Sequence, residues 1–324
     1  MANTLLEVED LKTHFFTRRG VVKAVDGVSF SLDVGETMGL VGESGSGKTI
    51  TSLSLLQLVP KPAGRIVGGR VVFDGEDLLT KTEKEMRDYR GSRLSMVLQD
   101  PMTSLNPVFT IGNQVAEPLV IHQHLKASAL WEKVKEMLRL VRIPAPEVRI
   151  RDYPHQMSGG MRQRVVGAIA LSCKPRLLIA DEPTTSLDVT IQSQYLRLLN
   201  EIQRESGVSM IFITHDLGIV ARICDRVAVM YAGKIVESAQ VRDLFNNPQH
   251  PYTVALMKSL PKLEERVDRL YSIGGQPPSL LKLPPGCAFY PRCSKADDKC
   301  RQKYPPSTRI ADGHFASCWR VKEQ

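Results

Sequence analysis

One short segment constrains the fold of this chain more than any other: a glycine-rich loop between an apolar stretch and a helix-like stretch. It fits the pattern Gly-x-x-x-x-Gly-Lys-[Ser/Thr] at every fixed position. Its residues are Gly42, Glu43, Ser44, Gly45, Ser46, Gly47, Lys48 and Thr49. Residues 37–41 are typical of a buried strand, and we expect a helix from Ile50 to Val59, ending at Pro60. The arrangement predicts an α/β fold with an anion-binding loop.

The residue types in this loop explain what it would bind. Glycines let the backbone curl so that successive N–H groups point at phosphate oxygens, and the following helix adds its positive N-terminal dipole. Lys48 would neutralise the β- and γ-phosphates, and the Thr49 hydroxyl would coordinate Mg²⁺. A flexible Gly/Ser loop with a chance lysine is the alternative, and the flanking strand and helix disfavour it. The pattern indicates a P-loop nucleotide-binding protein, which is a broad class.

A second motif points to hydrolysis. Residues 177–180 are apolar, and Asp181 and Glu182 follow them directly. Ligands of α/β sheets bind beyond the carboxyl ends of the strands, where these two acids would lie. Asp181 would hold Mg²⁺, and Glu182 would polarise the attacking water. An ordinary acidic helix cap is the alternative, and the phosphate loop makes the catalytic interpretation the stronger one.

The rest of the chain shows a main domain and a tail. Strand patterns occupy the first 35 residues, at 6–11, 21–25 and 28–32, and two buried-strand patterns lie at 177–180 and 210–213. Helical patterns at 130–143 and 189–204 predict βα crossovers and a parallel sheet. From about residue 246 proline becomes frequent, and four of the six cysteines lie between 287 and 318. We expect the boundary to lie near residues 236–250.

Charge and hydropathy along the chain bear on its partners and on where in the cell we expect it. The net charge of +8 would suit nucleic acid, an anionic membrane or polyphosphate. The chain has no long Lys/Arg block, so a solvated surface is favoured over a nucleic-acid stripe. No apolar run approaches the ~20 residues that span a bilayer, and the first ten residues lack the features of a signal peptide. We expect the protein to stay where it is made, with any membrane link through a partner.

Residues 157–164, Met-Ser-Gly-Gly-Met-Arg-Gln-Arg, resemble the LSGGQ signature of ABC ATPases. The signature is a second anion cradle at the head of a helix, which we expect at Val165–Ser172. The resemblance implies a head-to-tail dimer of ATPase subunits with two ATP molecules between them, each contacted in trans by Ser158, Gly159 and Gly160. Two methionines depart from the common motif. Met157 replaces leucine conservatively, whereas Met161 lacks the glutamine amide and any contact that amide makes.

The remaining motifs of the family follow in order. Gln99 resembles the Q-loop residue that ligates Mg²⁺ and responds to the membrane subunits, and Asp188 lies in a segment similar to the D-loop at the dimer seam. His215 is similar to the switch histidine that contacts the γ-phosphate. Phe15, or its neighbour Phe16, would stack on adenine, although a core phenylalanine remains the alternative.

The resemblance covers about residues 5–240 and implies the fold. We expect a RecA-like parallel-sheet core with an antiparallel β subdomain and a helical signature subdomain, plus a Cys-rich C-terminal extension. The ABC nucleotide-binding domain would comprise residues 5–245. The extension would comprise residues 246–324.

Four further segments resemble the oligopeptide/dipeptide importer ATPases: residues 99–107, 153–160, 229–233 and 250–253. The resemblance implies an ATP-hydrolysing subunit of a bacterial importer of di- and oligopeptides, with nickel or another small solute as the alternative cargo. It also implies two membrane-spanning permease subunits, a second ATPase subunit (a copy or a paralogue), and indirectly an extracytoplasmic solute-binding protein. The subunit would lie at the cytoplasmic face of the cell membrane.

The extension contains Cys287, Cys293, Cys300 and Cys318. Disulfides are disfavoured in the cytosol, so a cluster of thiols there calls for another explanation. Four thiolates can hold a [4Fe-4S] cluster. The spacing of these cysteines is similar to that in the tails of dipeptide-type members, and this resemblance implies such a cluster. Zn²⁺ is the alternative, although the absence of a Cys-x-x-Cys pair disfavours a zinc ribbon, and free or disulfide-bonded thiols remain open. A structural metal would staple a Pro-rich segment too small for its own core.

Two other classes compete with a transport ATPase. Soluble ABC ATPases that act on nucleic acid or ribosomes usually fuse two cassettes or insert a long coiled coil, and this chain does neither. We therefore expect no nucleic-acid partner. A regulatory nucleotide binder without catalysis is disfavoured because Lys48, Asp181, Glu182 and His215 are all present.

Overall fold

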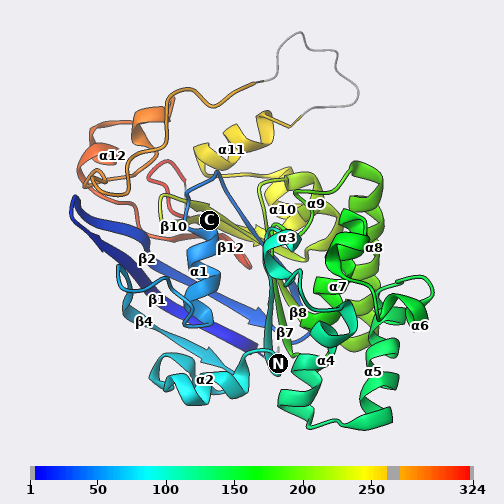
Figure 1. Cartoon of the computed structure of the whole chain (residues 1–324). Helices are drawn as coiled ribbons and strands as arrows, with labels where there is room; N and C mark the ends of the chain where they lie inside the picture. Colours follow the sequence, from blue (N-terminus) through cyan, green and yellow to red (C-terminus); the bar gives the residue numbers. More distant parts are fainter. Residues whose placement is uncertain (1–3, 261–270, 322–324) are drawn as a thin grey trace. The chain divides into compact units, whose positions relative to one another are not determined.

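The computed structural model of the chain describes residues 4–260 and 271–321 (Figure 1). These residues form two compact units, which are described separately. The helical unit comprises residues 33–36 and 80–212. The P-loop unit comprises residues 4–32, 37–79 and 213–321, so the chain crosses between the units several times.

The P-loop unit contains an antiparallel sheet in the order β2-β1-β4-β5. Its strands are β1 (Thr4–Thr17), β2 (Gly20–Asp33), β4 (Gly64–Phe73) and β5 (Glu76–Asp77). Apolar and polar residues alternate along β1, where Leu6 and Val8 are buried while Glu7 and Glu9 are exposed, as expected for a sheet with one solvated face. The prediction of two strands within residues 21–32 was wrong, because β2 continues through Gly27 without a turn.

The same unit contains a mixed sheet segment in the order β11-β12-β10-β9-β3. Its strands are β3 (Thr37–Val41), β9 (Arg226–Tyr231), β10 (Lys234–Gln240), β11 (Thr308–Ala311) and β12 (His314–Ala316). β3 and β9 are parallel, and β9, β10 and β12 are antiparallel neighbours. All five residues of β3 are buried, which is why this strand is a continuous apolar run. Two strands of the extension therefore complete a sheet that starts from the P-loop strand.

The helices of this unit are α1 (Lys48–Leu55), α9 (Leu217–Ile223), α10 (Val241–Asn246), α11 (Pro251–Lys258) and α12 (Asp298–Gln302), with a 3₁₀ turn at Leu78–Thr80 and another, η3, at Tyr290–Arg292. The helix predicted at residues 50–59 exists, but both of its ends were predicted wrongly. α1 starts two residues earlier, directly at Lys48, and ends at Leu55, because the N–H of Leu56 already closes the helix.

A buried carboxylate fastens the extension to this sheet. The Glu237 carboxylate on β10 accepts hydrogen bonds from the N–H groups of Gln249 and His250 at 2.7 and 2.8 Å. It also lies 2.8 Å from Nε2 of His314 on β12. His250 caps α11 by accepting from the N–H of Tyr252, and burial lowers the pKa of His250 to about 4, so its ring is a neutral acceptor. The His-Pro-Tyr segment is thus a structural joint.

The helical unit contains strands in the order β8-β7-β6: the first four residues of β8 (Ser209–Thr214), β7 (Leu177–Asp181) and β6 (Leu94–Val97). β6 and β7 are parallel. The sequence patterns at residues 177–180 and 210–213 predicted a parallel sheet, but β6 was not foreseen. The helices are α2 (Glu83–Tyr89), α3 (Pro101–Ser104), α4 (Ile111–Gln123), α5 (Ala127–Leu140), α6 (Pro146–Arg149), α7 (Gly159–Leu171) and α8 (Val189–Ser206), with a 3₁₀ turn at Pro154–Gln156.

Three of these helices, α4, α5 and α7, pack on one another (Figure 1). Their buried faces include Val115, Val134, Leu138 and Val165. α5 confirms the amphipathic helix predicted at 130–143, although it begins at Ala127 and ends at Leu140. Among the described residues of the chain, no helix combines the length and apolar character that crossing a membrane requires.

Candidate nucleotide site

The glycine-rich loop joins β3 to α1 and is shaped by backbone that only glycine accommodates. Gly42 has φ 154°, and a Cβ there would lie 2.3 Å from the carbonyl oxygen of Met230. Gly47 has φ 107°, and its Cβ would lie 2.4 Å from the carbonyl oxygen of Ala24. Real Cβ atoms do not approach backbone this closely, so both positions require glycine.

Lys48 is held inside the loop that precedes it. Its side chain is buried, with 5% exposure, and Nζ donates to the carbonyl oxygens of Gly42 and Glu43 at 2.8 and 3.1 Å. Lys48 is also the first residue of α1, whose N-cap Gly47 makes no side-chain hydrogen bond, so no capping side chain competes with an anion at this helix start. Ser46 Oγ is buried and has no hydrogen-bond partner within the described part of the chain. The loop thus combines a buried lysine, a buried hydroxyl and the start of a helix within a few residues.

In the helical unit, β7 ends in the two predicted acids. Asp181 closes the strand and is 2% exposed. Glu182 follows it, and its carboxylate accepts hydrogen bonds from Gln99 Nε2 at 3.2 Å and from Thr185 Oγ1 at 3.1 Å. Gln99 comes from the segment after β6, the strand parallel to β7. The structure therefore brings Gln99 and Glu182 together, although 83 residues separate them.

The backbone at Glu182 is strained. Its φ is 45°, in the left-handed region that non-glycine residues rarely adopt, and Pro183 follows it. Such a conformation costs about 1–3 kcal/mol and persists only where the surroundings impose it. Strain of this kind clusters at functional sites. Here it turns the chain sharply at the residue that sequence reasoning assigned to catalysis.

The signature segment starts α7 itself. The predicted helix start at Val165 was wrong: α7 begins at Gly159, and Ser158 is its N-cap, with Oγ accepting from the N–H of Met161 at 3.4 Å. Ser158 and Gly159 are exposed. A Cβ on Gly160 would lie 2.6 Å from Cγ2 of Ile191, in the first turn of α8. The N-cap of α8 is Asp188, the predicted D-loop residue. The helical unit therefore sets the signature beside the D-loop.

His215 lies in the P-loop unit, directly after β8, and its side chain is exposed. Of the two aromatic candidates on β1, Phe15 is partly buried against Gly64, whereas Phe16 is 44% exposed and lies under the guanidinium of Arg65.

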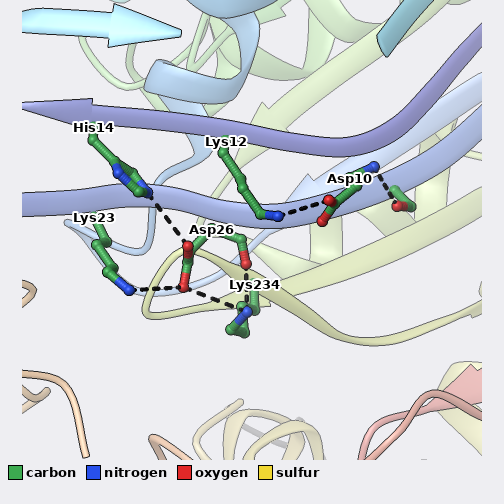
Figure 2. A network of polar contacts seen from close by, with 7 residues as sticks. Asp10, Lys12, His14, Lys23, Asp26 and Lys234 are labelled. Carbon is green, nitrogen blue, oxygen red and sulfur yellow. Dashed lines mark hydrogen bonds and ion pairs between the residues drawn. The ribbon is translucent and has the colours of Figure 1, made fainter. Parts of the chain in front are cut away.

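A polar network on the antiparallel sheet, beside Phe15, was not foreseen from the sequence. Figure 2 shows Asp26 of β2 facing Lys23, His14 and Lys234, at 3.9, 3.3 and 3.6 Å. Burial alone would raise the pKa of Asp26, but Lys234, Lys23 and His14 together hold it below its usual value. Because Lys234 starts β10, the network ties the β subdomain to the mixed sheet within one unit.

Comparison with known proteins decides the family. The family described as "ABC transporter" matches residues 25–185, and the family "Oligopeptide/dipeptide transporter, C-terminal region" matches residues 236–300. The probable peptide ABC transporter ATP-binding protein y4tR of Sinorhizobium fredii is 53% identical over 99% of this chain and 96% of that protein. The chain belongs to the ABC transporter ATP-binding proteins. Its reaction is the hydrolysis of ATP, coupled to transport.

Two further likenesses agree with this assignment. The dipeptide transport ATP-binding protein DppD of Bacillus subtilis is 50% identical over 97% of this chain and 94% of that protein. A solved dimeric structure of the ATP-binding cassette MJ0796, in a post-hydrolysis state with ADP and Pi, matches with a TM-score of 0.66. It is 23% identical and covers 73% of this chain and 99% of that chain, so the likeness concerns the fold. The α/β ABC cassette with one mixed and one antiparallel sheet confirms the predicted ABC fold, and the Cys-rich extension stays a prediction.

The motifs of this ABC ATPase divide between its two units. The P-loop, Phe15 and His215 lie in the P-loop unit. Gln99, Asp181, Glu182, Asp188 and the signature lie in the helical unit.

The contacts of Glu43 could not be foreseen from the sequence. Its carboxylate pairs with Arg292 of the extension at 2.7 and 2.9 Å, and its N–H donates to the Tyr252 hydroxyl at 2.8 Å. The only signal in the sequence was that Arg292 precedes Cys293 in a Pro-Arg-Cys segment. Nothing in that signal points to the phosphate loop.

The four predicted cysteines of the extension line one small pocket, together with His250, Phe289 and Trp319. Burial first, and then the other three sulfurs, raises the pKa of Cys287 to about 11. None of the cysteines forms a disulfide. In this conformation, no group of three or more His, Cys, Asp or Glu residues within the described ranges has the geometry of a metal site. Cys173 and Cys224 lie outside the cluster, where burial raises the pKa of each thiol.

Proposed function

We propose that this chain is the ATPase subunit of a bacterial importer that couples ATP binding and hydrolysis to the uptake of di- and oligopeptides. The observation that carries the proposal is the combination of a complete set of ABC motifs with the oligopeptide/dipeptide C-terminal region at residues 236–300. Relatives that are about half identical over nearly their whole length carry peptide and dipeptide transport in their names. An importer of nickel or another small solute is the alternative.

The residues divide the chemistry as follows. The loop 42–49 binds the ATP phosphates through its N–H groups and Lys48, and Phe15 stacks on the adenine. Glu182 orients and deprotonates the attacking water, and His215 contacts the γ-phosphate. Mg²⁺, when bound, offsets the phosphate charge. Thr49, Gln99 and Asp181 would hold it, since hydroxyl, amide and carboxylate oxygens are the ligands that this ion prefers.

The active form is a head-to-tail pair of ATPase subunits. Ser158 and Gly159 are exposed at the start of α7, so a ligand held by another chain could reach them. Asp188 caps α8, and the first turn of that helix approaches Gly160 at Ile191. In this arrangement Ser158, Gly159, Gly160 and Asp188 act in trans on ATP held by the partner's phosphate loop. The partner is a copy or a paralogue.

The remaining partners follow from the transport role. Two membrane-spanning permease subunits bind the ATPase pair at the cytoplasmic face of the cell membrane, and a solute-binding protein outside the membrane delivers the peptide to them. ATP-driven closure of the pair is transmitted to the permeases through the segment around Gln99, which also touches Glu182.

Uptake by the reconstituted transporter tests the proposal. Proteoliposomes with the assembled complex and internal ATP should accumulate a labelled dipeptide. Glu182→Gln should keep ATP binding but lower hydrolysis by roughly 10²–10⁴-fold, and uptake should fall with it. The control is Glu201→Gln, which removes a carboxylate of an exposed ion pair in the same unit. Uptake of nickel without peptide would favour the alternative cargo. ATPase activity that needs RNA or ribosomes, and no permease, would contradict the proposal.

We also propose that Cys287, Cys293, Cys300 and Cys318 hold a structural [4Fe-4S] cluster. The four thiols converge on one pocket lined by Phe289 and Trp319, and thiolates are the ligands of such clusters. Because burial opposes ionisation of the Cys287 thiol, a bound metal would be what stabilises its thiolate.

Metal analysis of anaerobically purified protein tests this cofactor. The wild-type chain should contain about four irons and four sulfides, with a brown chromophore, and Cys300→Ser should lose most of both. Cys173→Ser should keep them, because Cys173 lies outside the cluster. One zinc per chain without iron, or no metal at all, would contradict the iron–sulfur assignment.

A further inference from the structure

We propose that Arg292 and Tyr252 of the extension are positioning residues for the phosphate loop. They hold Glu43, the second residue of the loop, through its side chain and its backbone at once. The proposal rests on the proposed role of residues 42–49 in binding ATP phosphates. It gives the C-terminal region a part in nucleotide binding that the loop pattern does not contain.

The side-chain contact is a two-pronged ion pair. Arg292 Nη1 and Nη2 donate to Glu43 Oε2 and Oε1 at 2.7 and 2.9 Å. The arginine side chain is 4% exposed and the glutamate 27%. Arg292 Nη1 also donates to the Tyr231 hydroxyl at 3.2 Å. A fork of two parallel bonds fixes the orientation of the carboxylate as well as its distance, which a single lysine contact would not.

The backbone contact comes from a different part of the extension. The N–H of Glu43 donates to the hydroxyl of Tyr252 at 2.8 Å, and Tyr252 is fully buried in the first turn of α11. This N–H therefore points at the extension. The phosphates would be bound by the N–H groups of the residues that follow Glu43 in the loop. Tyr252 and Arg292 together restrain both the backbone and the side chain of Glu43, close to the end of β3.

The anchors themselves stand on a packed cluster. Tyr231, Tyr252 and Phe289 pack with ring centroids 4.6–5.4 Å apart. Arg292 ends the turn η3, where its N–H donates to the carbonyl of Phe289 at 2.9 Å, and its Nε donates to the carbonyl of Gly274 at 3.0 Å. The guanidinium is thus presented by a rigid aromatic base, and so it can position the loop.

Two physical effects link this contact to ATP affinity. A loop that is already in its bound shape loses less conformational entropy when the phosphates arrive. Glu43 also carries a negative charge on a loop that binds a polyanion, and Arg292 offsets that charge at close range. Removal of Arg292 should therefore weaken ATP binding twice: through a looser loop and through an uncompensated carboxylate. Neither Arg292 nor Glu43 takes part in the hydrolysis of the ATP once it is bound.

The second effect gives a test that separates positioning from simple stability. In the purified, assembled transporter, Arg292→Gln should raise the KM for ATP about ten-fold with kcat within about two-fold of wild type. Arg292→Lys should recover part of this loss, because it restores the charge without the fork. The double variant Glu43→Gln, Arg292→Gln should recover more, to within about three-fold of wild type, since the isolated carboxylate is gone.

Tyr252→Phe removes only one hydroxyl and guards against misfolding. It should raise the KM about three-fold and leave the thermal unfolding temperature nearly unchanged. The control is Arg309→Gln, which breaks the exposed pair of Arg309 and Asp312 in the same extension and should leave the KM unchanged.

Several results would overturn the proposal. Folded Arg292→Gln and Tyr252→Phe variants with wild-type KM would refute it. A double variant no better than Arg292→Gln alone would refute the charge compensation, and an equal loss of thermal stability and of kcat in Arg292→Gln would show that the arginine serves stability only. Lys48→Ala tests the underlying assignment independently, because it should abolish ATP binding; if it does not, residues 42–49 are not the phosphate site, whatever Arg292 does.

Discussion

Two segments of this ABC ATPase begin helices with a glycine-rich turn, yet they are built differently. In the phosphate loop, Gly47 caps α1 without a side chain, Lys48 is buried and bonded to loop carbonyls, and Glu43 is anchored from the extension. In the signature, Ser158 caps α7 with its own hydroxyl and is exposed, as is Gly159.

The two segments are suited to two ways of contacting a phosphate. The phosphate loop is shaped by backbone contacts within its own unit, so its donors are arranged before ATP arrives. The start of α7 is satisfied by Ser158 in the absence of a ligand, and it faces outward. A phosphate brought by another chain would have to share or replace that cap. The phosphate loop is therefore shaped within a single chain, whereas the signature, in the function proposed above, contacts ATP held by a partner.

The largest effect should come from glycine substitutions in the phosphate loop. Gly47→Ala would place a Cβ 2.4 Å from the Ala24 carbonyl oxygen in a left-handed conformation, so the loop must deform. We expect a loss of ATP binding by a single subunit of more than roughly 100-fold, or about 3 kcal/mol. Binding of a fluorescent ATP analogue by the purified subunit measures it.

Gly45→Ala is the matched control for Gly47→Ala. Gly45 also has positive φ, but a Cβ there meets nothing within 4 Å. The control therefore adds only the conformational cost of about 1–2 kcal/mol. Equal loss in both variants would show that close packing against β2 is not what shapes the loop, and the comparison with the signature would fail.

The local features of the chain could be predicted because they depend on neighbours in sequence. The phosphate loop, the acids after β7 and the helix α8 follow from residue types at short spacing. Glu182 and Gln99 were each predicted from their own motifs, and the structure adds their 3.2 Å contact. Element ends were less accurate, because capping decides them: with Ser158 as its N-cap, α7 begins at Gly159, six residues before the predicted start.

What could not be predicted depends on residues far apart. Arg292 and Glu43 are 249 positions apart, and nothing in the composition of either segment marks them as partners. The strands β11 and β12 have four and three residues and lack a clear alternation. They are recognised as strands because β12 pairs with the edge of β10 in the structure. From the sequence, Glu237 is expected to be an ordinary surface acid. In the structure it is buried and has three polar contacts with residues of the extension.

A smaller effect should come from the signature, and it tests the other half of the comparison. Gly160→Ala would place a Cβ 2.6 Å from Ile191 Cγ2, whereas a Cβ on Gly159 meets nothing within 4 Å. Overpacking of this kind costs about 1–3 kcal/mol, partly offset by the better helix propensity of alanine. Because the strain lies between α7 and α8, it should disturb the face that carries Asp188.

We therefore expect Gly160→Ala to lower the ATPase rate of the assembled transporter by about five-fold, with ATP binding to the single subunit within two-fold of wild type. Ile191→Ala removes both γ-carbons that the new methyl would meet, so the double variant should recover most of the rate. If Gly160→Ala weakened ATP binding by the single subunit, the signature would act within its own chain. Gly159→Ala would then be expected to share the defect, whereas an outward-facing signature predicts that its effect appears only when two subunits meet.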